Sequence, residues 1–164
     1  RGRPTGREKT MAAAEPNARS WPQAVGIGLL VSIITAAMML ALTAAGLSPF
    51  PKPPSLAFAE TMLGRTLPPP VGLLFHTLYV TFWSVIFVRY IPHRDLWTAL
   101  GLAGVLWLVI LVVFFPVVGW GFAGVSVSLR LIPASFVPHL LFGLLLWALD
   151  KYLPASRSAR SAAG

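Results

Sequence analysis

Two histidines, His76 and His139, are the residues of this sequence whose type and spacing could carry chemistry. Each lies in a long apolar stretch six residues after a proline, His76 after Pro70 and His139 after Pro133. Imidazole nitrogen is a common ligand for haem iron. Two imidazoles at one depth of a membrane are what axial ligation of a b-type haem requires. The spacing therefore supports the hypothesis that His76 and His139 bind haem b.

Other interpretations of the two histidines stay open. An imidazole inside a membrane also hydrogen-bonds a neighbouring helix, and a repeated segment duplicates structural residues as readily as functional ones. An ionisable group within a membrane span can instead mark a quinone, lipid or proton site. We expect structural hydrogen bonding and no bound cofactor, with haem b as the alternative. We expect no separate metal site.

The histidine stretches belong to a longer internal repeat. Residues 70–92 and 133–154 each place an aromatic residue three positions after the histidine. Each then ends on a basic residue, a tyrosine, an aliphatic residue and a proline. A rise of 1.5 Å per residue puts each histidine about 9 Å below its starting proline. If two hairpins repeat about an axis along the membrane normal, the histidines are pseudosymmetry mates at similar depth.

Several kinds of chemistry have no support in the sequence. It contains no cysteine, which removes thiolate nucleophiles, cysteine-ligated zinc and iron–sulfur clusters. It has no phosphate-binding Gly-Lys motif, no HExxH and no serine nucleophile elbow. It also lacks the pair of intramembrane carboxylates that ion-driven transporters usually need. We therefore expect no catalytic residue and a protein that is not an enzyme.

The composition indicates a membrane protein. Of the 164 residues, 56% are hydrophobic and 11% are charged, against roughly 25% charged in a soluble domain. The net charge of +8 would suit nucleic acid, but the basic residues lie in tails and short loops that flank apolar segments. We therefore expect membrane lipids and other membrane subunits as partners, and no nucleic acid.

Four apolar segments are each near the length of about 20 residues that crosses a bilayer. We expect spans at about 23–47, 70–91, 96–118 and 133–150, forming an all-α four-helix bundle of two hairpins. Residues 1–20 are predicted to be a disordered basic tail, 21–153 the transmembrane domain and 154–164 a flexible tail. Met11 leaves the true start residue open.

The longest loop, residues 48–69, is predicted to hold a short amphipathic helix. Ser55 is the expected cap at its start, and Gly64 is the expected end. Glu60 is the only acidic residue in this loop. We expect its carboxylate to be solvated or paired with Lys52 or Arg65.

Small residues recur in the first and third predicted spans. Such residues let membrane helices approach closely, which favours helix packing without a hydrophobic driving force. In the first span they repeat every four residues in two rows. The predicted helix-packing residues are Gly28, Ser32, Ala36, Ala37, Ala41, Gly101 and Gly104.

The distribution of basic residues predicts the orientation. Four spans place both termini on one side of the membrane. That side holds every lysine and arginine of the chain except Lys52, Arg65 and Arg130. The positive-inside rule then puts both termini in the cytoplasm.

The segments GLLFHTLYVTFWSVIF and PHLLFGLLLWALDKYLP, with the intervening AFAETMLGRTLPPP loop, resemble small uncharacterised bacterial inner-membrane proteins of the YagU-like kind. The resemblance covers about residues 25–153. It implies a multi-pass helical protein of the bacterial inner membrane and carries no established catalytic residue.

Together these features predict a non-catalytic accessory or scaffold subunit that packs within a larger bacterial membrane complex. One alternative is a bis-histidine haem b electron-transfer protein. Another is a small lipid or solute permeation protein.

Overall fold

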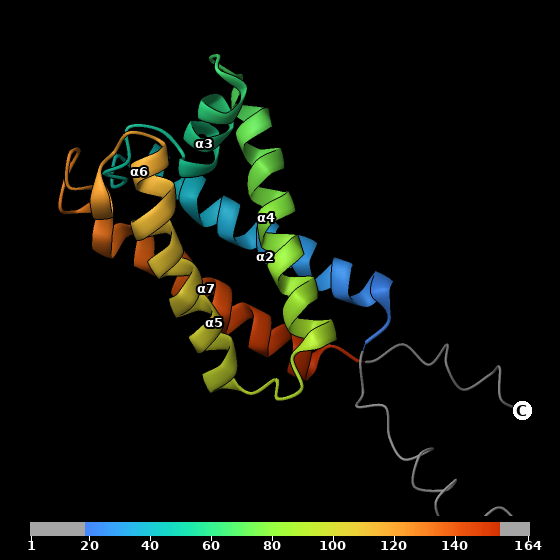
Figure 1. The fold of residues 1–164 in the computed structure, drawn as a ribbon. Coiled ribbons are helices and arrows are strands. Elements are labelled where there is room, and N and C mark those ends of the chain that lie inside the picture. Colours follow the sequence, from blue (N-terminus) through green and yellow to red (C-terminus); the bar gives the residue numbers. More distant parts are fainter. Residues whose placement is uncertain (1–18, 155–164) are drawn as a thin grey trace, which may run out of the picture.

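The computed structural model describes residues 19–154, which form helices and connecting turns with no strand among them (Figure 1). The elements are α2 (Trp21–Ala44), α3 (Pro54–Leu63), α4 (Pro69–Tyr90), α5 (Leu96–Val109), the π-helical turn η1 (Ile110–Phe114), α6 (Phe115–Val117), the 3₁₀ turn η2 (Phe122–Gly124) and α7 (Leu131–Tyr152). The predicted tails, 1–20 and 154–164, lie almost wholly outside the described residues.

Four helical segments are long and apolar enough to cross a membrane, which confirms the predicted all-α architecture. They are Trp21–Ala44, Pro69–Tyr90, Leu96–Val117 and Leu131–Tyr152. The last begins before Pro133, the residue predicted to start it. Proline is tolerated in a first helical turn because the N–H groups there have no intrahelical acceptor.

The short helix α3 differs from its prediction at one end. It begins at Pro54, so Ser55 lies inside the helix and does not cap it. Proline suits a first helical position because its φ is already helical. Gly64 ends the helix as predicted, with a left-handed φ of 63° that glycine adopts without steric cost.

A π-helical turn lies near the C-terminal end of the third span. Phe115 donates its backbone N–H to the carbonyl of Ile110, five residues earlier. The next residue, Pro116, has no N–H, and its ring would clash with the carbonyl four residues before it in a regular α-helix. We attribute the wider turn to this proline, which leaves the helix free to continue to Val117.

The spans pack as two hairpins. Helix α2 packs against α4, and α5 packs against α7, and the helices of each pair cross in the view of Figure 1. Helix α2 also contacts α7 and so joins the two pairs. Helix α3 packs on α4 at the end of the bundle far from both described chain ends. We call this the loop end, and the end with Arg19 and Pro154 the terminal end. The cytoplasmic placement of the terminal end stays a prediction.

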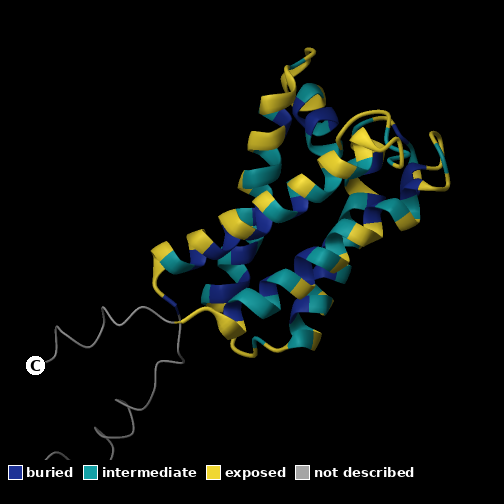
Figure 2. Cartoon of the chain, turned by 180° about the vertical axis from the view of Figure 1, so that it is seen from behind, coloured by how far each residue is buried: buried dark blue, intermediate teal, exposed yellow. Residues whose placement is uncertain are grey.

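Two apolar cores hold the bundle together. One lies between the four spans and the other at the loop end, around Phe115 and Trp120. Exposed residues line the outer faces of the spans, while buried ones face inward (Figure 2). Many outward residues are large and apolar, including Ile33, Leu78 and Val105. Such outer faces suit a lipid environment.

Candidate functional site

His76 lies in a hydrogen-bonded seam between α4 and α2. Its Nε2 is 3.2 Å from Thr35 Oγ1 and 3.3 Å from the Ser32 carbonyl oxygen. The Thr35 hydroxyl donates to backbone carbonyls of its own helix, so it is an acceptor toward His76. This pattern assigns the ring proton to Nε2. The Ser32 hydroxyl extends the seam by donating to Thr77 Oγ1 at 3.1 Å.

His139 lies on α7 and is held by its own helix. Its Nδ1 is 2.7 Å from the carbonyl oxygen of Ser135, one helical turn earlier. The Ser135 hydroxyl donates to the Ile132 carbonyl and accepts from Trp107 Nε1 of α5 at 3.2 Å. This network joins α5 to α7. Because Nδ1 carries the proton, Nε2 of His139 keeps its lone pair.

The two histidines lie on different helices, and within residues 19–154 no hydrogen bond joins their rings. Haem ligation needs an unprotonated nitrogen on each ring. His139 fits, because an Nδ1–H bound to a carbonyl is the usual support for an Nε2 ligand. His76 does not fit as it stands, because its Nε2–H is donated to α2. Among residues 19–154, no group of three or more acidic or histidine side chains gathers around a possible metal position.

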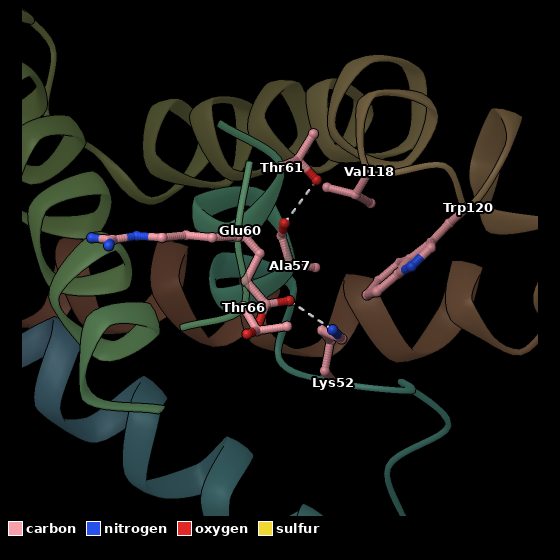
Figure 3. A pocket seen from close by; sticks show the side chains of 8 residues that line it. Lys52, Ala57, Glu60, Thr61, Thr66, Val118 and Trp120 are labelled. Carbon is pink, nitrogen blue, oxygen red and sulfur yellow. Dashed lines mark hydrogen bonds and ion pairs between the residues drawn. The ribbon is translucent and has the colours of Figure 1, made fainter. Parts of the chain in front are cut away.

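A shallow hollow of about 270 Å³ lies at the loop end (Figure 3). In it, Lys52 Nζ is 2.6 Å from a carboxylate oxygen of Glu60, and the Leu67 N–H donates to the other oxygen at 3.1 Å. The hydrogen bond from Lys52 is the main cause that holds the pKa of Glu60 below its ordinary value of 4.5. This confirms the predicted pairing of Glu60. The remaining lining residues are Ala57, Thr61, Arg65, Thr66, Val118 and Trp120.

The small residues of α2 divide between two faces. A Cβ added at Gly28 would lie 2.8 Å from Thr81 Cα of α4, and Ser32 is also buried, with Ala36 half-buried one turn further along. Ala37 and Ala41 are exposed. Only the first of the two rows therefore lies in the contact with α4.

The small residues of α5 are divided in a similar way. A Cβ added at Gly101 or Gly104 would meet no atom of another element within 4 Å. Contact with α7 instead uses Ala99 and Ala103, which lie against Gly143. The chain's own α5–α7 contact therefore leaves the two predicted glycines out.

The sequence analysis missed a buried ionic cluster at the terminal end. Asp150 of α7 accepts from Arg19 Nε at 2.7 Å and from Arg94 Nε at 3.1 Å, and its side chain is only 7% exposed. Arg19 also donates to the backbone carbonyls of Asp150 and Leu153. The sequence did contain a pattern that could have indicated this cluster. Asp150 is the acid at the end of the fourth span, and an arginine flanks each of the other three spans on the same predicted side of the membrane.

The fold and these contacts define a multi-pass helical membrane protein made of two packed hairpins. No protein-family model matches the chain, and neither the curated proteins nor the solved structures contain a match. The YagU-like resemblance therefore stays a prediction.

Proposed function

We propose that this protein is a non-catalytic accessory or scaffold subunit that packs within a larger bacterial inner-membrane complex. The observation that supports this is the set of small residues facing outward from two spans. Ala37 and Ala41 of α2 are exposed, and open space surrounds the Cβ positions of Gly26, Gly101 and Gly104. Small residues on a lipid-facing surface let a helix of a partner protein approach closely.

Purification in mild detergent tests this proposal. We expect a larger membrane protein to be recovered in fixed stoichiometry with the chain. Gly101→Leu should abolish recovery of the partner without unfolding the bundle. A Cβ added at Gly101 has no atom of another element within 4 Å. Leu78→Phe is the control, because it adds bulk at an exposed position of α4 outside the small-residue rows. Recovery of the lone monomer, or equal loss in both variants, would contradict the proposal.

A bis-histidine haem b protein is the second candidate. The lone pair on His139 Nε2 favours it, whereas His76 would first have to release Thr35 and Ser32. Haem would supply one-electron transfer. The test is a visible absorption spectrum before and after dithionite reduction. A sharp reduced α band that is lost in His76→Ala and His139→Ala would support this candidate, and a featureless spectrum from folded protein would contradict it.

A small lipid or solute permeation protein remains the third candidate. Such a protein needs a polar cavity between its spans. Two hollows lie at the loop end, one around Glu60 and one between the end of α2 and the start of α7. No specific contact supports permeation over the first two candidates.

A further inference from the structure

The terminal end gathers more positive than negative charge around one carboxylate. Arg19 precedes α2, Arg89 is in the last turn of α4, and Arg94 precedes α5. Arg19 and Arg94 pair with Asp150. Arg89 donates from its guanidinium to the Arg19 carbonyl, and that guanidinium lies 4.9 Å from the centre of the Trp21 ring. Three arginines thus gather at this end, and two of them pair with the single carboxylate of Asp150.

The other two charged side chains of this end, among residues 19–154, have opposite signs. The exposed carboxylate of Asp95 caps α5 by accepting the Thr98 N–H at 2.7 Å. The negative charge of Asp95 is offset in the count by the positive charge of Lys151. The Lys151 ammonium group lies against the rings of Trp147 and Tyr152. Two helices begin and two helices end here, so the partial charges of their termini oppose one another. Counted within residues 19–154, Asp150 and the three arginines carry a formal net charge of about +2.

Arg89 also has a donor without an acceptor. Its Nε–H is buried and has no hydrogen-bond partner within the described part of the chain. Buried N–H groups are almost always paired in folded proteins. The cluster reaches the surface at Arg94, whose side chain is 19% exposed. A planar guanidinium matches two oxygens of a phosphate group, and its charge strengthens both hydrogen bonds.

Aromatic side chains place this cluster at the level of lipid headgroups. Trp21, Tyr90, Trp97 and Tyr152 are all more than half exposed and lie at the terminal end. Tryptophan and tyrosine concentrate at membrane–water interfaces, where the phosphate groups of lipids lie. Basic pockets between spans recognise anionic headgroups at this level.

We propose that Arg89 and Arg94, supported by Arg19, bind the phosphate of an anionic phosphate ester at the terminal end. The position of the cluster favours a phospholipid over a soluble phosphate compound. The local charge of about +2 favours a lipid with a net negative charge, such as phosphatidylglycerol, over the zwitterionic phosphatidylcholine. This site is separate from the outward small residues and does not require the proposed partner.

Native mass spectrometry of the detergent-solubilised chain tests the site. We expect phosphatidylglycerol to bind more tightly than phosphatidylcholine. Arg89→Gln and Arg94→Gln should each weaken phosphatidylglycerol binding by about fivefold, the factor expected per basic residue near a membrane surface. Arg89→Lys should weaken binding less than Arg89→Gln, because it keeps the charge but loses the planar pair of donors. Arg130→Gln, a matched change at the loop end, should have no effect.

Competition separates the two sources of the phosphate. If excess glycerol phosphate leaves lipid binding unchanged, the ligand is a phospholipid, and displacement indicates a soluble phosphate ester. Equal binding of the two lipids would overturn the proposal, as would an equal loss in Arg130→Gln. Arg89→Gln is the deciding variant if Arg94→Gln fails to fold, because it leaves both bridges to Asp150 in place.

Discussion

Replacing Asp150 with asparagine is expected to lower the free energy of unfolding by about 3–5 kcal/mol, the usual cost of removing one partner from a buried ion pair. The Asp150 carboxylate bridges Arg19 and Arg94, and its side chain is 7% exposed. Asparagine keeps the shape but removes the charge, so two guanidinium groups would face each other without a counterion. Unfolding in mixed micelles at increasing SDS, followed by tryptophan fluorescence, measures the loss.

Glu60→Gln is the control for this experiment, because it removes an acid from an exposed ion pair at the opposite end. The Lys52 side chain is 44% exposed, and surface pairs of this kind contribute about 0–1 kcal/mol. Arg19→Gln should lower the free energy of unfolding less in the Asp150→Asn variant than in the unchanged protein, because the carboxylate that pairs with Arg19 is already absent there. If Asp150→Asn and Glu60→Gln lower the free energy of unfolding equally, burial does not strengthen the ion pairs of the terminal cluster.

The sequence was sufficient to predict the four spans. A helix must be long and apolar to cross a bilayer, and both properties can be read from neighbouring residues. The repeat around His76 and His139 also indicated two hairpins, and α2–α4 and α5–α7 pack in that way. The third span was predicted at about 96–118, and the helix runs from Leu96 to Val117, although the π-helical turn before Pro116 was not foreseen.

The contacts within the bundle could not be predicted in the same way. The spans are apolar on all sides, so no polar face indicates how each helix is rotated toward its neighbours. Two rows of small residues on α2 were equally suited to packing, yet the row with Gly28 faces α4 and the row with Ala37 faces outward. The partners of His76 and Asp150 depend on these rotations and on residues far away in the chain.

Gly28→Ala is expected to destabilise the bundle by about 1–3 kcal/mol, the usual cost of overpacking a close contact. The new Cβ would lie 2.8 Å from Thr81 Cα and 3.1 Å from Ser84 Cβ of α4. The nearest of these atoms belongs to the backbone, so the two helices must separate and the seam that holds His76 must lengthen. The same SDS titration measures this change.

Gly26→Ala provides a control in the same helix, only two residues away. A Cβ at Gly26 meets no atom of another element within 4 Å, and alanine favours a helix over glycine by up to about 1 kcal/mol. Gly26→Ala should therefore leave stability unchanged or raise it. If Gly28→Ala destabilises the bundle no more than Gly26→Ala does, the close approach of α2 to α4 does not hold the first hairpin together. That result would also weaken the proposed role of the outward small residues, because this role depends on the same kind of close contact, made with a helix of a partner protein.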